Sequence, residues 1–376
     1  MMAVKRVKGS LLSHASKRGR LAGYRLGWSH GLRYGKSEAV IRSQPPQHLP
    51  VRDFSVLLVT SGMGYPFSPI DHAVTNAMKK QVRKLQVCSP KDDIVAVAAQ
   101  FRPTLVIVLL GTHMPVTTVA SLKLLGIKTA IWYSDDPYYT DTTRNTAIYY
   151  DFVFTNELSC VEFYRQVGCR HVYHMPLAVD LSAFRPMKPK RGYYSDICFI
   201  GSAYWYRVEF FNKIAPYLIK QDVKIFGWWW QRLSLYSRLA RSIRTEWLSP
   251  EETARYYNGA KIVINLHRSP DDETFNKNSS RVAALSTNPR TFEICGTGAF
   301  QLTDARLDLP SHYTPGHDLI TYTSAEDLVN KLNYYLEHEE ERNQIALNGL
   351  KKTVRDHTFD QRVRALLSIL AERLVL

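Results

Sequence analysis

An arginine and a glutamate spaced one helical turn apart could together hold a nucleotide. The segment 288–304, NPRTFEICGTGAFQLTD, places Arg290 and Glu293 three residues apart, which puts both side chains on one face of a helix near its first turn. A guanidinium there can hold a diphosphate, and a carboxylate can accept hydrogen bonds from both hydroxyls of a ribose. The alternative is a local ion pair, which stabilises a helix by only ~0.2–0.5 kcal/mol.

Other residues could contact phosphates. Gly201 and Ser202 follow the strand-like DICFI and open a predicted helix, where bare amide groups can approach a phosphate closely. Arg207 lies five residues further on and could reach the same phosphates, as could Lys277 and Arg281 in the polar stretch DDETFNKNSSR. The alternatives are an ordinary strand-end turn and solvated charges.

Aromatic residues follow the predicted strand VKIFG. Gly227 and Trp228 stand where a base could stack on an indole, whereas Trp229 and Trp230 fit packing at a domain interface better. His267 ends the strand-like KIVINLH and could donate to a phosphate or a sugar hydroxyl, although a lone histidine is more often structural.

The first half of the chain offers candidates for a general base. Asp135 and Asp136 end the strand-like KTAIWYS, and either carboxylate could take a proton from an acceptor hydroxyl. Neighbouring carboxylates point apart, so we expect only one to face a ligand, and the other reading is a helix cap. His113 is the competing base. Gly62 and Gly64 allow close approach of a substrate. The spacing of the aspartates argues against a metal site.

These residues need parallel sheets to bring them together. Short apolar strands alternate with helices of ten to fifteen residues, which is typical of a parallel sheet covered on both faces. We expect an α/β protein with two Rossmann-like domains facing a cleft. Its divisions are a basic Gly-repeat extension and linker (1–52), a Rossmann-like domain (53–180), a linker (181–195) and a second Rossmann-like domain (196–376) whose last helix could pack on the first.

In the first domain we expect strands at FSVLLVTS, RPTLVIVLLGT, KTAIWYSDDP, DFVFTNE and HVYHMPLAVD, with helices over about 69–84, 116–125 and up to about 167. The second domain is expected to repeat the alternation, with strand-like segments SDICFIGS, VKIFGWWW, KIVINLH and AFQLTD and helices over SPEETARYYNGA, at PRTFEICGTG and from Ser324.

The net charge of +15 over 376 residues is concentrated at one end. Residues 1–52 hold 11 basic side chains and one acidic one, so a nucleic-acid function is not indicated for the folded body. Glycine recurs every fourth residue from Gly19 to Gly35, which indicates either a helix that needs a partner or a mobile tail. Pro45, Pro46 and Pro50 predict a linker.

Composition excludes several classes of protein. With 45% hydrophobic residues the chain is neither disordered nor collagen-like, and no apolar run reaches the ~18 residues of a membrane span. The five cysteines are widely spaced, as expected for reduced thiols of an intracellular protein. A signal peptide is not predicted, and an organellar transit peptide is a minor alternative.

The strings CFIGSAYWYR, VKIFGWWW, KIVINLH and NPRTFEICGTGAFQLTD, in this order, resemble the carboxy-terminal half of the spore-maturation CgeB/YkvP-like glycosyltransferases. WYSDDPY and the basic, glycine-rich start are similar to that family's amino-terminal part, so the resemblance covers about residues 20–360. It implies the GT-B architecture, with an acceptor on the first domain and a nucleotide sugar on the second. It also maps the family's glutamate to Glu293, its small-residue turn to Gly298 and its phosphate-facing glycine to Gly201.

We therefore expect a metal-independent glycosyltransferase without a cofactor, whose donor is a UDP- or dTDP-linked sugar and whose acceptor is a glycan or a protein. The alternatives are a nucleotide-sugar epimerase of the same fold and a catalytically silent spore-coat or scaffold protein. We expect a bacterial cytoplasmic location, at the developing spore surface. The Gly-repeat segment is a candidate for partner binding or self-association.

Overall fold

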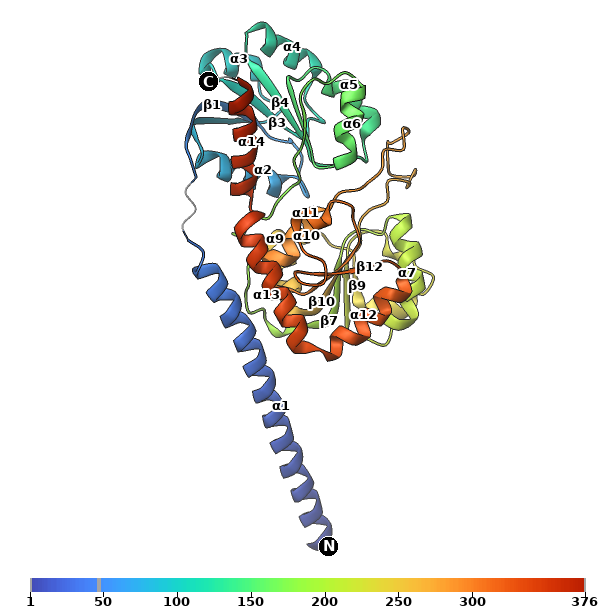
Figure 1. Ribbon diagram of the computed structural model, residues 1–376. Helices are drawn as coiled ribbons and strands as arrows, with labels where there is room; N and C mark the ends of the chain where they lie inside the picture. The colour runs from blue at the N-terminus through green and yellow to red at the C-terminus, as the bar shows by residue number, and fades with distance from the viewer. Residues whose placement is uncertain (1, 46–48, 375–376) are drawn as a thin grey trace.

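The computed structural model describes residues 2–45 and 49–374, which form two parallel sheets with helices on both faces (Figure 1). The first sheet has the order β2-β1-β3-β4-β5-β6. All of its neighbouring strands pair in parallel. Its strands are β1 (Arg52–Val59), β2 (Val82–Cys88), β3 (Leu105–Leu109), β4 (Lys128–Tyr133), β5 (Phe152–Thr155) and β6 (Val172–His174).

Both faces of this sheet are covered because its strands are apolar on both sides. Every residue of β3 and of β5 is buried. One face packs on α2 (Ser68–Lys79) and on the last helix, α14 (Phe359–Leu374), so the end of the chain returns to the first domain. The other helices are α3 (Ile94–Phe101), α4 (Val116–Leu124), α5 (Thr140–Ala147) and α6 (Leu158–Gln166).

The second sheet has the order β12-β11-β10-β7-β8-β9, again with every neighbouring pair parallel. From β7 to β9 successive strands are added toward one edge of the sheet, and from β10 to β12 they are added toward the other, so the strand order reverses between β7 and β10. Open parallel sheets bind ligands at such a switch point. The strands are β7 (Ser195–Ile200), β8 (Val223–Phe226), β9 (Ile243–Arg244), β10 (Ala260–Asn265), β11 (Gln301–Asp304) and β12 (Ile320–Tyr322).

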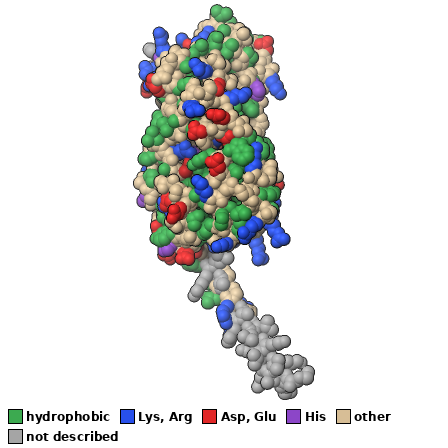
Figure 2. Space-filling model, turned by 90° about the vertical axis from the view of Figure 1, so that its right-hand side faces the viewer, with side chains coloured by type: hydrophobic (Ala, Val, Ile, Leu, Met, Phe, Trp, Pro, Cys, Tyr) green, Lys and Arg blue, Asp and Glu red, His purple; other side chains and the backbone are tan. Residues whose placement is uncertain are grey.

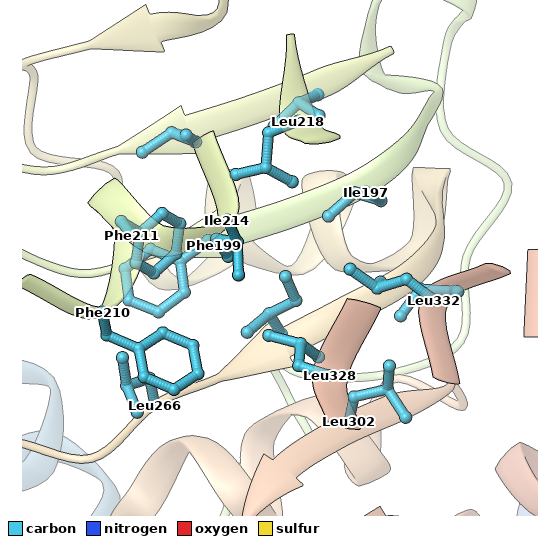
Figure 3. Close-up of a cluster of buried hydrophobic side chains, with 14 of the residues drawn as sticks. Ile197, Phe199, Phe210, Phe211, Ile214, Leu218, Leu266, Leu302, Leu328 and Leu332 are labelled. Atoms are coloured by element: carbon cyan, nitrogen blue, oxygen red, sulfur yellow. The ribbon is translucent and has the colours of Figure 1, made fainter. Parts of the chain in front are cut away.

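Interdigitating aromatic and aliphatic side chains fill one face of this second sheet (Figure 3). Phe199 of β7 packs against Phe211 of α7 at a ring distance of 4.8 Å, and Leu328 and Leu332 of α12 close the cluster. The helices are α7 (Trp205–Leu218), α8 (Tyr236–Leu239), α9 (Pro250–Gly259), α10 (Pro289–Gly296), α11 (Leu309–His312), α12 (Ala325–Glu337) and α13 (Glu339–Asp356).

The basic extension forms one long helix, α1 (Met2–Arg42), that projects from the second domain (Figure 1). Its last turns lie against the body, where Val40 packs on Leu350 and Val354 of α13. The imidazole of His30 stacks on Tyr194 with 5.1 Å between ring centroids. A Cβ added at any glycine of the four-residue series would meet no atom within 4 Å, so this stripe faces away from the body. The segment is thus helical, and the partner predicted for its glycine stripe stays a prediction.

The predicted helix over 69–84 is too long. The helix α2 ends at Lys79, and Val82–Cys88 form β2. In β2 only the first and last residues are buried, because it is an edge strand and its VRKLQVC sequence alternates with no continuous apolar run. The following helix α3 was not predicted either.

Charges of both signs are interspersed over the two domains in the space-filling view (Figure 2). The five cysteines are all buried and free. Within residues 2–45 and 49–374, no helix is both long and apolar enough to cross a bilayer. Of the predicted proline linker, Pro46 lies outside the described residues.

Candidate functional site

Two loops of the second sheet touch at its carboxyl edge. The Gly201 amide donates to the Phe226 carbonyl at 2.8 Å, and the Ala203 amide donates to the Trp228 carbonyl at 2.8 Å. Gly227 has φ +132°, and a Cβ there would lie 2.3 Å from the Gly201 carbonyl oxygen. The loops after β7 and β8 can therefore lie this close only because position 227 carries no side chain.

Arg207 of α7 lies directly beneath the first of these loops. Its Nη1 donates to the Ser202 carbonyl and its Nε to the Leu266 carbonyl, both at 3.0 Å. The side chain is buried, and burial followed by the nearby Arg290 charge lowers the pKa of Arg207 to about 10. Arg207 contacts the Leu266 carbonyl and the α10 cap Asn288 donates to Asn265, so Arg207 and the start of α10 flank the end of β10, where their charges favour an anion.

Arg290 and Glu293 lie on the first turns of α10, as their spacing predicts. The cap residue Asn288 accepts from the Thr291 amide, which fixes where the helix begins. Burial raises the pKa of Glu293 to about 7, although Arg290 lowers it. Among the described residues none hydrogen-bonds or ion-pairs with this carboxyl group, so its oxygens are free to accept from a ligand.

His267 is already fully engaged. Its Nδ1 lies 2.5 Å from Asp304 Oδ1, and its Nε2 accepts from the Asn288 amide at 2.9 Å. Arg306 donates to the other oxygen of Asp304 at 2.8 Å. Burial alone would raise the pKa of Asp304, but His267 and Arg306 hold it at about 2. In this arrangement His267 links β10, β11 and the start of α10 and has no ring nitrogen left for a ligand.

The three successive tryptophans have different surroundings, and Trp229 and Trp230 pack within the second domain rather than at the predicted domain interface. Trp230 is fully buried and donates to the Gly201 carbonyl at 3.0 Å. Trp228 is 42% exposed and packs edge-on against Trp247, with 5.3 Å between ring centroids. Trp228 therefore presents an accessible indole beside the Gly227 loop, whereas Trp229 stacks on Phe275.

Asp135 and Asp136 point in different directions. Asp136 is buried and accepts from Thr155 at 2.7 Å and from the Tyr164 hydroxyl at 3.0 Å. Burial raises its pKa to about 7. Asp135 is also buried enough to raise its pKa to about 6, and Arg268 of the second domain opposes that rise. No described residue hydrogen-bonds to the Asp135 carboxylate, so of the two only Asp135 is available to a substrate.

His113 and the glycines of the first domain lie on the loops that follow β3 and β1. His113 is exposed. Gly62 has φ +69°, which a side chain would strain, whereas Gly64 has open space around it. A small pocket at the ends of β1, β3 and β4 is lined by Ser61, Asp71 and Ser134 among others.

Three residues predicted to contact the donor lie outside the loops after β7 and β8 and outside the first turns of α10. Gly298 follows the end of α10, at the opposite edge of the sheet, and a Cβ there would lie 3.2 Å from Ser37 of α1. Arg281 is exposed and 3.7 Å from Glu273. Lys277 is exposed, and its main chain pairs with Tyr138 and Asp141 of the first domain.

The most informative residue that the sequence analysis missed is Arg268, which follows His267. Its guanidinium carbon lies 4.2 Å from the ring centroids of both Tyr138 and Tyr204. These two rings come from different domains, so Arg268 lies where the carboxyl edges of the two sheets meet. The sequence signal that could have identified Arg268 is an arginine shortly after β10, the strand beside the switch point. Arg306, two residues after β11, was also missed.

The part of the chain that the structure describes contains no preformed metal site. Within those residues no group of three or more His, Cys, Asp and Glu side chains is placed to hold an ion.

Several solved structures share this two-domain architecture. HepE of Anabaena, solved with UDP and glucose, has a TM-score of 0.60 at 10% identity and covers 85% of this chain and 100% of its own. Sucrose-phosphate synthase of Thermosynechococcus elongatus has a TM-score of 0.58 at 11% identity, covering 86% and 99%. A putative UDP-N-acetylglucosamine 2-epimerase of Listeria monocytogenes has a TM-score of 0.53 at 11% identity, covering 86% and 96%. The fold is that of the GT-B glycosyltransferases.

Two sequence comparisons narrow this class to a family. The model of a family described as glycosyl transferase-like matches residues 207–368. Spore protein CgeB of Bacillus subtilis (strain 168) is 30% identical over 309 residues, which cover 81% of this chain and 95% of the relative. The chain belongs to the CgeB family of glycosyltransferase-like proteins.

Proposed function

We propose that this protein transfers a sugar from a nucleoside diphosphate sugar to a glycan or protein acceptor. The observation that carries this proposal is the meeting of Arg207, Arg290 and Glu293 at the switch point of the second sheet. Two close cations and a carboxylate without a partner match the diphosphate and ribose of such a donor.

In this proposal the second domain binds the donor. Amide groups at Gly201 and Ser202 and the charges of Arg207 and Arg290 would neutralise the departing diphosphate. Glu293 would accept from the ribose, and the base would lie beside Gly227 and Trp228. Neutralisation by arginines makes a metal ion unnecessary for this step, so we propose metal-independent transfer.

Asp135 is the proposed general base if the reaction inverts the anomeric centre. Its carboxylate comes from the first domain, is free of hydrogen bonds from the described residues and has a pKa of about 6. A base of that pKa is ionised near neutral pH yet can still take a proton from a hydroxyl. Asp136 serves the fold instead, and His113 remains the alternative base.

We propose a hexose donor carried on UDP or dTDP, because HepE was solved with UDP and glucose. The test is thermal-shift screening with nucleoside diphosphates and their sugars, with and without EDTA. We expect UDP- or dTDP-sugars to raise the melting temperature equally in both conditions. A panel without any effect would contradict the proposal, and an effect lost in EDTA would contradict metal independence.

The second candidate function is epimerisation of a nucleotide sugar, because a putative UDP-N-acetylglucosamine 2-epimerase has the same fold. An epimerase would convert the donor without an acceptor. Incubation of the protein with a nucleotide sugar alone, followed by chromatography of the products, separates the two functions. A catalytically silent scaffold protein of this fold would bind no nucleotide at all.

We propose that the protein acts in the bacterial cytoplasm at the developing spore surface, since its relative is a spore protein. The exposed part of α1 would dock on an acidic region of the acceptor, because Lys17, Arg18 and Arg20 are exposed and no acid precedes Glu38. Charge reversal of these three residues should weaken turnover of the acceptor and leave donor binding unchanged. A fluorescent fusion that stays dispersed during sporulation would contradict the location.

A further inference from the structure

Arg268 is a buried cation held between aromatic rings of two domains. It follows β10 on the second domain and is only 9% exposed. Its guanidinium carbon lies 4.2 Å from the centroid of Tyr138 on the first domain and 4.2 Å from that of Tyr204 on the second. An arginine sandwiched in this way is attracted by both ring faces. The contact therefore joins the two domains.

Hydrogen bonds of both its side chain and its main chain hold Tyr138 in this position. The Tyr138 hydroxyl donates to the Arg268 carbonyl at 3.1 Å. The Lys277 amide donates to the Tyr138 carbonyl at 2.8 Å, and the Asp141 amide donates to the Lys277 carbonyl at 2.9 Å. The connection from β10 to α10 thus pairs with residues 138–141 of the first domain, and Arg268 lies near its start.

The charge of Arg268 is not balanced by a neighbouring acid. One of its nitrogens, Nη2, donates to the Phe275 carbonyl at 3.0 Å, while the buried Nε has no hydrogen-bond partner. Within the described residues Arg268 forms no ion pair. A buried guanidinium without an ion-pair partner attracts a nearby carboxylate strongly, because the protein interior screens charges less than water does.

Asp135 lies near this charge, because the Tyr138 amide donates to the Asp135 carbonyl at 3.1 Å and the Tyr138 ring stacks on Arg268. Burial raises the pKa of Asp135, and Arg268 is the group that opposes the rise. The other titratable groups that face Asp135 are Asp136, Tyr138 and Tyr139, all from its own segment, and none of them is a cation. Arg268 is therefore the cation, contributed by the other domain, that favours the ionised form of Asp135.

We propose that Arg268 is a positioning residue that joins the two domains through Tyr138 and places its charge beside Asp135, opposite the donor-binding loops. This role rests on the proposed function, because an ionised Asp135 matters only if it acts as a base. The consequence is that Asp135 becomes a competent base only when the domains are together. Removal of the Arg268 charge would leave donor binding in place but make Asp135 harder to ionise.

The test measures Asp135 directly and needs no acceptor. The full chain is labelled with 13C at aspartate carboxyls, and the Asp135 signal is assigned by its loss in Asp135→Asn. We expect the titration midpoint of Asp135 to rise by about one unit or more in Arg268→Met. In Arg268→Lys, which keeps the charge but not the planar stack, the midpoint should stay near the wild-type value. An unchanged midpoint in Arg268→Met would overturn the proposal.

Hydrogen exchange of the same variants tests the domain contact. We expect amides of residues 138–141 to exchange at least tenfold faster in both Arg268→Met and Arg268→Lys, since both lose the planar sandwich. Equal rates in wild type and variants would refute the joining role. If Arg268→Met does not fold, Tyr204→Leu, which removes one ring of the sandwich on the second domain, must show the faster exchange instead.

These results are separable from the proposed function. A wild-type protein that binds no nucleotide sugar would refute glycosyl transfer while the Asp135 midpoint still reports on Arg268. Conversely, the protein could bind the donor while the titration midpoint of Asp135 is the same in wild type and in Arg268→Met. That result would leave glycosyl transfer intact and refute the role of Arg268.

Discussion

Burial acts on three carboxyl groups with different consequences. The pKa values of Asp135, Asp136 and Glu293 are raised to about 6, 7 and 7. Asp136 receives hydrogen bonds from Thr155 and Tyr164, so its burial serves the fold. The other two lack such partners among the described residues, which suits groups that wait for a ligand.

Replacement of Asp135 should remove a step in the pH dependence of transfer. Because the pKa of Asp135 is about 6, wild-type turnover should rise as the pH increases through 6, where the carboxylate forms. Asp135→Asn should lower turnover by a factor of about 100 or more and abolish this step. Initial rates over pH 5–8 provide the measurement. A retained step would assign the base to His113 or to no residue.

Replacement of Glu293 should weaken donor binding. Glu293→Gln keeps the size of the side chain but removes the acceptor charge that the ribose hydroxyls need, so we expect affinity to fall by about tenfold or more. Calorimetric titration with the best nucleotide sugar measures it. Glu337→Gln, on the distant helix α12, is the matched control. Equal affinities would exclude Glu293 from the ribose.

Asp136 should make stability depend on pH. Its folded pKa of about 7 exceeds the ordinary value of 3.8, so the folded state binds its proton more tightly. This contribution to the free energy of unfolding is complete below pH 3.8 and is lost as the pH rises toward 7. Asp136→Asn should flatten that decline in urea titrations, whereas Asp222→Asn, at an exposed position, should not. An unaltered decline would contradict a raised pKa.

At the scale of elements, apolar patterning predicted the two parallel sheets but not every strand. The strands β1, β3 and β4 were predicted because their residues are buried on both faces, which produces continuous apolar runs. The strand β2 was missed because it lies at an edge and is mostly exposed. The spacing of Arg290 and Glu293 placed both on α10. The pairing of Arg268 with Tyr138 could not be predicted, because it depends on how two domains meet.

The contact between the loops after β7 and β8 leads to a test with a matched control. Gly227→Ala would place a Cβ 2.3 Å from the Gly201 carbonyl oxygen at a positive φ, so the loops must separate. We expect a loss of about 2 kcal/mol or more in the free energy of unfolding, together with weaker donor binding. Gly192→Ala meets no atom within 4 Å and should change neither. Equal denaturation midpoints for the two variants would refute the close contact.

At the scale of the whole molecule, α1 has a bound end and a free end. Val40 and Ser37 are buried against the second domain, whereas Tyr24 and Trp28 are 68% and 65% exposed. The charge of the extension is thus carried on a helix anchored to the donor domain, which is a different arrangement from a loose tail.

Two deletions should separate these parts of α1. Removal of residues 1–28 should leave the melting temperature unchanged, because none of the side chains described there packs on the body. Removal of residues 1–44 should lower it, since Val40 leaves Leu350 and Val354 uncovered, at a cost of about 1.5–3 kcal/mol for the lost burial. Differential scanning calorimetry makes the comparison. Donor binding should survive both, and its loss would place α1 in the site.

The return of α14 to the first domain has a consequence for synthesis of the chain. Phe359, Val363 and Leu367 complete the core that begins with β1, so the domain made first is finished last. While the ribosome is still translating the second domain, one face of the first sheet is covered by α2 but lacks α14. A truncation that removes α14 would therefore damage the first domain, and a cut at the linker would separate that domain from the helix that completes its core.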